Sequence, residues 1–331
     1  MTGTKSPLLA LPGAVPAEGP DEGVAAHYGE IFPEQRRLAA GEGFVDLSHR
    51  GVITVTGEDR LSWLHLLLTQ HVSQLPPHQA TEALILSPHG HVEHALYLVD
   101  DGSTVWAHVE PGTQQALIAY LESMKFFYRV EVRDATADYA VVHLPNGSSA
   151  SAEGAAAVRE VSPGGSAAGP YGRDLFVPRD RLEALAAGYG PAAGIWAYEA
   201  LRIEAHRPRL GFETDHRTIP HEVDWLTTAV HLQKGCYRGQ ETVARVHNLG
   251  RPPRRLVFLH LDGLEETLPP HGTEVRLASD PDGRALGFVT SSARHHELGP
   301  IALAIVKRNV PVDAPLLAGT VPAAQEVVVP Q

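Results

Sequence analysis

Residues 45 to 133 carry an order of strands and helices that few folds can accommodate. Val52-Ile53-Thr54-Val55 alternates as a strand, and the turn Gly57-Glu58-Asp59 leads into a helix with a leucine face. Strands are predicted over 82–86, 92–99 and 104–108, a helix over 112–125, and a last strand over 128–133. The order strand, helix, three strands, helix, strand predicts a mixed α+β layer.

Breaks in composition divide the rest of the chain. Residues 1–25 are rich in Pro, Gly and Ala and predict a loose arm, which a short helix extends to residue 43. We expect one α+β domain over 44–135 and a second over 136–250. After the breaker Pro252-Pro253 we expect a small all-β barrel or sandwich over 251–331.

The second domain is expected to hold fewer regular elements than the first. Residues 144–170 predict a Gly, Ser and Ala loop and 174–178 a strand, while helices are predicted over 179–187, 192–206 and 222–232. The predicted fold class is therefore α+β: two ferredoxin-like layers and a C-terminal all-β barrel.

Charge and cysteine content exclude several kinds of protein. The formal net charge is -12, which disfavours a nucleic-acid partner. The chain contains no run of about 18 apolar residues, so no membrane span is expected. The one cysteine, Cys236, rules out an internal disulfide and a self-contained four-thiolate metal site, and fits a reducing cytoplasm.

The sharpest motif is Lys234-Gly235-Cys236-Tyr237-Arg238-Gly239-Gln240-Glu241. Its glycines allow a close backbone approach to a ligand. Lys234 and Arg238 flank Cys236 and would increase its share of thiolate if they point at the sulfur. The alternative is a turn that opens a helix, with Cys236 as a small buried hydrophobe.

The charge around this octapeptide is unlike that of the whole chain. From Lys234 to Arg255 there are six cations and one acid, Glu241. A solvated basic face explains most such runs. Because this one adjoins a turn framed by glycines, a local anion site is a second interpretation.

The octapeptide resembles the K-G-C-Y-x-G-Q-E signature of YgfZ-type proteins at every fixed position. Further segments resemble, in the right order, the broader family that these proteins share with the glycine-cleavage T-protein. They are residues 46–48, 55–60, 86–90, 200–205, 219–222, 287–291 and 298–304. The resemblance therefore covers about residues 45 to 310.

The resemblance implies a three-domain cloverleaf around a central channel that holds a folate. The implied cofactor is tetrahydrofolate or a derivative, whose flat ring needs an apolar wall and whose anionic tail needs cations. Candidate binding residues are Arg202, Tyr198, Trp196, Tyr237, Arg238 and Glu241, and Cys236 with Lys234 is the candidate functional thiol site. Core packing of Trp196 and helix N-terminal capping by Glu241 are the structural alternatives.

We expect an accessory protein for assembly or repair of iron–sulfur enzymes, with folate and iron–sulfur proteins or their assembly factors as partners. The alternative is a folate-dependent aminomethyltransferase. Glu93-His94 stands where the transferring members have an Asp pair, and Pro170 stands where their pterin-gripping glutamate lies. Both departures disfavour the transferase. A third option is an interaction protein with a vestigial channel.

The histidine-rich stretch from His89 to His94 invites a metal site. On a strand that begins at Val92, His91 and Glu93 share one face while His94 points to the other. Because this spoils a three-ligand cluster, no metal is expected. The chain also lacks the glycine-rich phosphate motifs and the G-x-S-x-G of serine hydrolases.

Overall fold

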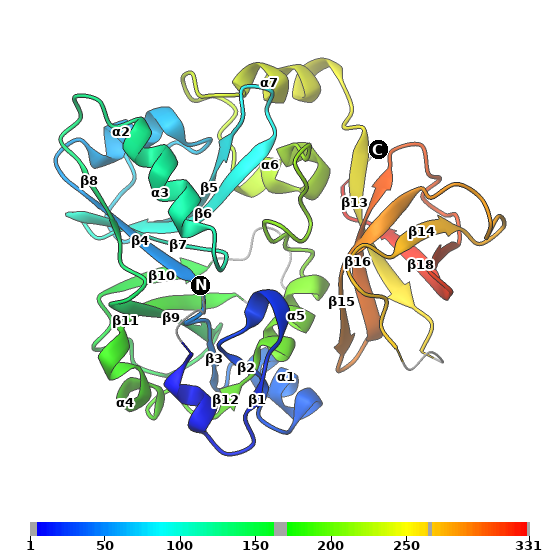
Figure 1. The fold of residues 1–331 in the computed structure, drawn as a ribbon, viewed down its shortest axis with the longest axis horizontal. Helices are drawn as coiled ribbons and strands as arrows, with labels where there is room; N and C mark the ends of the chain where they lie inside the picture. The colour runs from blue at the N-terminus through cyan, green and yellow to red at the C-terminus, as the bar shows by residue number, and fades with distance from the viewer. Residues whose placement is uncertain (1–4, 162–170, 264–266, 330–331) are drawn as a thin grey trace.

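The computed structural model describes residues 5–161, 171–263 and 267–329. Within them the chain forms two five-stranded sheets, a small two-stranded sheet and a closed six-stranded barrel. In Figure 1 the first large sheet lies above the second on the left side of the molecule, and the barrel lies on the right side. The predicted α+β class with a C-terminal barrel is confirmed.

The first sheet has the strand order β5-β6-β7-β4-β8, with every neighbouring pair antiparallel. Two helices cover it because leucines recur on one face of each, and Leu64, Leu67, Leu117 and Leu121 are buried in its core. Its elements are β4 (Gly51–Thr56), α2 (Arg60–Leu67), β5 (Ala80–Leu86), β6 (Val92–Asp100), β7 (Thr104–Val109), α3 (Gln114–Ser123) and β8 (Glu131–Asp134).

The second sheet has the order β10-β11-β9-β3-β12 and takes β3 from the segment that precedes the first sheet. Residues 44–46, which we assigned to the first domain, therefore belong to the second layer. Strand β10 lies inside the predicted 144–170 loop, of which residues 162–170 lie outside the described part. The elements are β3 (Phe44–Asp46), β9 (Tyr139–Pro145), β10 (Ala157–Val161), β11 (Gly172–Pro178), α4 (Leu182–Ala186), β12 (Ala192–Ala193) and α5 (Ile195–Glu204).

The N-terminal segment is packed onto the second layer, so the prediction of a loose arm is wrong. Its glycines and prolines shape turns that carry Leu8 and Val24 into the core, where both are buried. Asp21 forms an ion pair with Arg209 at 2.8 Å. The segment contains η1 (Pro7–Ala10), β1 (Val15–Pro16), η2 (Gly19–Asp21), β2 (Ala25–His27) and α1 (Ile31–Ala39).

The predicted helix over 222–232 is mostly broken. Asp224 adopts a left-handed φ of 61°, which separates a 3₁₀ turn from a single helical turn. The segment that joins the second layer to the barrel contains η4 (Pro220–Val223), α6 (Trp225–Thr228) and α7 (Gln240–Leu249). Trp225 is buried in a core that also takes Leu84 from the first sheet and Ile305 from the barrel. This core fixes the three parts around the connecting segment.

The barrel closes in the order β13-β16-β15-β14-β17-β18. Its strands alternate inward and outward side chains, and the inward residues form a separate core around Val257, Val289 and Ala304. The strands are β13 (Arg254–Leu261), β14 (Glu274–Leu277), β15 (Gly287–His295), β16 (Gly299–Lys307), β17 (Leu316–Ala318) and β18 (Val321–Val327). Among the described helices, none is long and apolar enough to cross a bilayer.

Candidate functional site

The octapeptide forms a turn that runs into the first two residues of α7 and packs on the hairpin between β5 and β6. Gly239 has a φ of 82°, and a methyl group there would lie 2.6 Å from the Ser87 carbonyl oxygen and 2.9 Å from the Gly90 Cα. Gly90 has a φ of 81° and is equally closely packed against Thr242. The two glycines are therefore required because two backbones meet there.

Lys234 anchors this turn to the first layer. Its ammonium donates hydrogen bonds to the carbonyl oxygens of His65 and Leu68, and to that of Gln70 at 3.2 Å. These carbonyls belong to the C-terminal end of α2 and the residues after it, where cations are favoured. Burial lowers the pKa of Lys234 to about 8. The structure therefore gives Lys234 an anchoring position, and its predicted influence on the thiol stays a prediction.

Cys236 is exposed to solvent, so the alternative of a buried small hydrophobe does not apply. Arg238 pairs with Glu93 at 3.1 Å and lies over the ring of Tyr120. Tyr237 is buried, its ring 5.2 Å from the Lys234 nitrogen, and burial raises its pKa to about 12. The thiol of Cys236 therefore faces solvent, while the next two residues, Tyr237 and Arg238, are held by their contacts with Lys234, Glu93 and Tyr120.

Glu241 and His94 complete the surroundings of the turn. Glu241 is exposed in the first turn of α7, where a carboxylate faces the positive end of the helix. His94 on β6 lies beside Tyr120 of α3. Burial, together with the charge of Arg238, lowers the pKa of His94 to about 4. His94 is therefore neutral near pH 7 and Glu93 is paired.

The candidate residues on α5 lie apart from the octapeptide, since α5 is between the second layer and the barrel while α7 is at the outer end of the first layer (Figure 1). Arg202 donates five hydrogen bonds within the protein: two to Glu199, and one each to Glu213, Ser291 and the carbonyl of Arg207. Its guanidinium has no further N–H to offer a ligand.

Tyr198 and Arg202 line an inner cavity that four further arginines also line. The cavity volume is about 20 Å³, which holds one water rather than a ring system. Its remaining lining residues are Arg50, Tyr97, His108, Arg159, Val161, Asp174, Arg207, Pro208 and Arg209. Among the described residues, this cavity does not provide the central folate channel that the resemblance implies, because ionic side chains fill it.

Acidic side chains from several segments pair with the arginines of this cavity. Glu110 pairs with Arg50 at 3.3 Å and with Arg209 at 2.8 Å. Asp174 accepts hydrogen bonds from Arg159 at 2.9 Å and lies at hydrogen-bond distance from two histidines. Burial alone would raise its pKa, but these partners hold the pKa of Asp174 well below its usual range. Asp174 is thus a fixed negative charge rather than a proton carrier.

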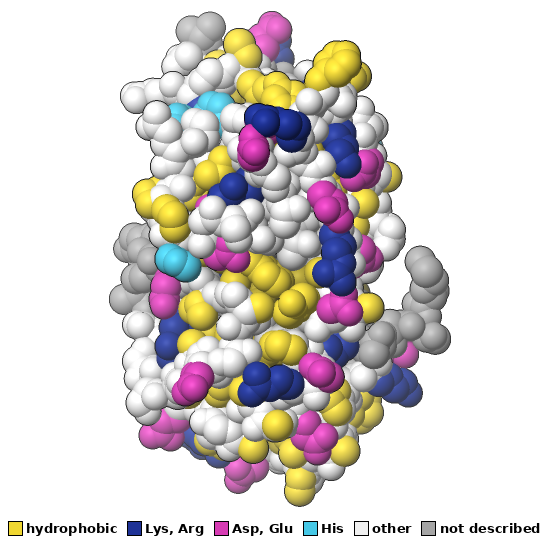
Figure 2. Space-filling view, turned by 90° about the vertical axis from the view of Figure 1, so that its left-hand side faces the viewer, with side chains coloured by type: hydrophobic (Ala, Val, Ile, Leu, Met, Phe, Trp, Pro, Cys, Tyr) yellow, Lys and Arg dark blue, Asp and Glu magenta, His cyan; other side chains and the backbone are white. Residues whose placement is uncertain are grey.

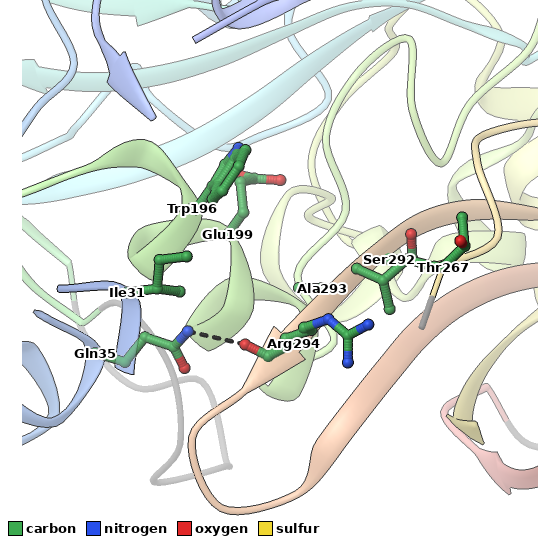
Figure 3. Close-up of a pocket in the computed structure, with 9 residues that line it drawn as sticks. Ile31, Gln35, Trp196, Glu199, Thr267, Ser292, Ala293 and Arg294 are labelled. Atoms are coloured by element: carbon green, nitrogen blue, oxygen red, sulfur yellow. Dashed lines mark hydrogen bonds between the residues drawn. The ribbon is translucent and has the colours of Figure 1, made fainter. Parts of the chain in front are cut away.

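An open groove of about 420 Å³ lies between α1, α5 and β15 (Figure 3). Trp196 forms one wall with half of its surface exposed, and its ring contacts that of His27 at 5.2 Å. Gln35 donates to the Arg294 carbonyl at 2.8 Å and ties α1 to β15. The lining residues are Ile31, Gln35, Trp196, Glu199, Thr267, Leu268, Ser292, Ala293 and Arg294.

Glu199 connects the groove with the inner cavity. One of its oxygens accepts from Arg202 at 2.8 and 2.9 Å, and the other lies 3.1 Å from Arg209. Both arginines line the inner cavity, whereas Glu199 itself lines the groove. The groove therefore offers an aromatic wall suited to a flat ring. The Glu199 carboxylate is engaged by Arg202 and Arg209, and the Gln35 amide by the Arg294 carbonyl and the His296 N–H.

The structure divides the candidate residues into three places. Trp196 lies in the groove, Tyr198 and Arg202 lie in the inner cavity, and the octapeptide residues form the outer turn. Sequence reasoning missed Glu199 and Gln35. Glu199 follows Tyr198 and precedes Arg202 by one helical turn, which was a usable signal. Gln35 had none, because only the tertiary fold brings α1 to β15.

Comparisons with known proteins agree with this fold. No protein-family model matches the chain. A chloroplastic protein of Arabidopsis thaliana, assigned provisionally to the transferases, is 26% identical over 75% of this chain, which spans 61% of that protein's length. An aminomethyltransferase of Nostoc is 26% identical over 84% of this chain and 80% of its own.

The mitochondrial iron-sulfur cluster assembly factor IBA57 homolog of Mycosarcoma maydis is 25% identical over 76% of this chain and 68% of its own length. Among solved structures, the glycine cleavage system aminomethyltransferase T of Bartonella henselae superposes with a TM-score of 0.81. It is 19% identical and covers 97% of this chain and 94% of its own. The chain is therefore similar in sequence to aminomethyltransferases and to an iron-sulfur cluster assembly factor, and it has the fold of the glycine-cleavage aminomethyltransferase T.

Proposed function

We propose that the protein binds a tetrahydrofolate and serves the assembly or repair of iron–sulfur enzymes. The observation that carries the proposal is the octapeptide turn, which is fixed by Gly239 and Lys234 and holds Cys236 in solvent. A lone exposed thiol cannot hold a cluster by itself, so it acts on a cluster that a partner carries. A relative named as an iron-sulfur cluster assembly factor supports this role.

Folate fits the groove rather than the inner cavity. A volume of about 420 Å³ lies within the usual range for small-molecule sites, whereas about 20 Å³ does not. Trp196 supplies the flat wall, and Glu199, which Arg202 and Arg209 hold, fixes the α5 side of the groove. Arg202 positions Glu199 and makes no direct contact with the ligand. When bound, the folate supplies a carrier for one-carbon groups.

The other octapeptide residues support the thiol turn in this proposal. Arg238 and Glu93 fix its outer side, and Tyr237 packs beneath it. Glu241 does not line the groove, so it does not bind a pterin there; it stabilises the start of α7 instead. The partners are folate and iron–sulfur proteins or their assembly factors. We propose a cytoplasmic location, because a single cysteine fits a reducing compartment; the relative from Mycosarcoma maydis is described as mitochondrial.

Aminomethyl transfer is the second candidate, because several relatives carry that name. It requires an acid or base poised at the folate ring. Glu93 is paired with Arg238 on the surface, His94 has a pKa of about 4, and Asp174 is held as a fixed anion. Pro170 lies outside the described residues. The described acids and bases therefore favour the accessory role.

A deletion strain tests the proposal. Loss of the protein is expected to lower iron–sulfur enzyme activities, wild type is expected to restore them, and Cys236→Ala is expected to fail while it still binds tetrahydrofolate. Turnover of an aminomethyl donor by the purified protein would instead support the transferase. Normal iron–sulfur enzyme activities in the deletion strain would overturn the accessory role.

A further inference from the structure

Four exposed apolar side chains lie on α2 and on the segments that contact its two ends. Phe126 and Phe127 are 77% and 99% exposed on the turn between α3 and β8, and Leu66 is 46% exposed on α2 itself. Leu232 is 40% exposed just before the octapeptide. We call the surface formed by the two phenylalanines, together with the neighbouring Leu66 and Leu232, the aromatic face. Figure 2 shows the side of the molecule that contains α2 and β8; hydrophobic side chains reach the surface at several places on it, some of them near the upper end.

The two phenylalanines are held on a closed turn. Tyr128 donates its N–H to the Lys125 carbonyl at 3.0 Å, and Phe126 between them adopts a left-handed φ of 41°. A bulky residue rarely occupies that region, because its Cβ crowds the backbone. Neither the exposure nor the backbone conformation of Phe126 stabilises the isolated protein. Such an outlier is a reason to look for a function.

Helix α2 links this turn to the thiol. At one end, Trp63 donates to the Met124 carbonyl at 3.0 Å and Asp59 accepts from the Arg129 N–H at 2.8 Å, so both flanks of the turn rest on α2. At the other end, Lys234 donates to the carbonyls of His65 and Leu68. An eight-residue helix is about 12 Å long, so the turn and Cys236 lie within reach of one partner.

We infer that the aromatic face is the docking surface for the iron–sulfur protein on which Cys236 acts, which rests on the proposed function. Exposed phenylalanines are typical anchors of such contacts. Two of them bury about 300–500 Å², which is less than the roughly 800 Å² per partner of a stable complex. The contact is therefore transient, as a protein that serves several clients requires, and too small for a permanent dimer.

Two other occupants are less compatible with the molecule. The cations beside the turn are already paired, Lys125 with Glu122 and Arg129 with Glu58 and Asp59. The chain carries a net charge of -12. An anionic membrane would be repelled rather than attracted. A second copy of the chain that docked on the aromatic face would bury too little area for a stable dimer.

The test compares Phe126→Ser/Phe127→Ser with a matched control, Leu298→Ser/Val312→Ser, in the deletion strain. Leu298 and Val312 are each 42% exposed and lie on the barrel loops, away from α2. The phenylalanine variant is expected to restore less than a third of the iron–sulfur enzyme activity that wild type restores. Its melting temperature and tetrahydrofolate affinity are expected to be unchanged, and the control is expected to restore activity fully.

A direct measurement uses a purified cluster-free [4Fe–4S] dehydratase of the same organism as the probe. The phenylalanine variant is expected to bind it at least tenfold more weakly than wild type and the control do. Equal binding, or full restoration of activity by the variant, would overturn the docking surface. So would a phenylalanine-dependent dimer in sedimentation, or binding to vesicles that contain phosphatidylserine. Failure of wild type to restore activity would instead remove the proposed function.

Discussion

At the scale of single residues, the account depends on which side chains are already engaged. Arg202 was a natural candidate for a ligand contact, yet all its N–H groups are used inside the protein. Lys234 was expected beside a thiolate, yet its ammonium faces backbone carbonyls. A sequence names the residue types of a site, whereas hydrogen-bond partners come from segments that are distant in the chain.

Replacement of Lys234 by methionine tests its anchoring role. The change leaves three carbonyl oxygens without their shared donor, so we expect a loss of about 2–3 kcal/mol in the free energy of unfolding. Urea titration measures it. Lys307→Met is the control, because Lys307 donates to a single carbonyl, that of Ala285, and should lose less than about 1.5 kcal/mol. Equal losses would show that Lys234 is no special anchor.

At the scale of elements, the sequence predicted what local pattern decides. The leucine face of α2, the alternation of β6 and the breaker before β13 are local signals, and all three elements formed as expected. Strand β3 and the N-terminal segment were misjudged, because β3 is only three residues long and pairs with strands about 100 residues away. The close contact of Gly239 with Gly90 was equally invisible, although the glycines themselves were conspicuous.

Gly239 and Gly235 form a matched pair for testing this contact. Gly239→Ala places a methyl group against the Ser87 carbonyl at a positive φ, so we expect at least about 2 kcal/mol of destabilisation. Gly235→Ala meets nothing within 4 Å and should change stability by less than about 0.5 kcal/mol. Thermal unfolding of both variants measures the difference. If the two melted together, the backbone contact would not matter.

At the scale of the whole molecule, the cloverleaf arrangement was predicted and its interior was not. The octapeptide and the order of the weaker segments indicated the family, and the superposition confirmed the fold. The arginine-filled centre and the groove beside Trp196 depend on how three parts meet, which no local pattern encodes. The site had therefore to be found from cavities and ion pairs.

Stability is expected to fall on acidification below pH 6.5. Burial lowers the pKa values of His94, His108 and His221 to about 4, whereas the unfolded chain has histidines near 6.5. Between these values the unfolded state binds protons that the folded state does not, so acid favours unfolding. Melting temperatures from pH 7 to 4 measure the decline. His108→Gln should flatten it, and a curve unaffected by pH over this range would contradict the burial of neutral histidines.

Calorimetric titration with tetrahydrofolate tests the central claim most directly. The account predicts that wild type binds one equivalent and that Trp196→Ala binds at least tenfold more weakly. It predicts that Val312→Ala, on the loop between β16 and β17, binds as wild type does. Absence of binding by wild type, or equal affinity of the Trp196 variant, would contradict a folate site in the groove between α5 and the barrel.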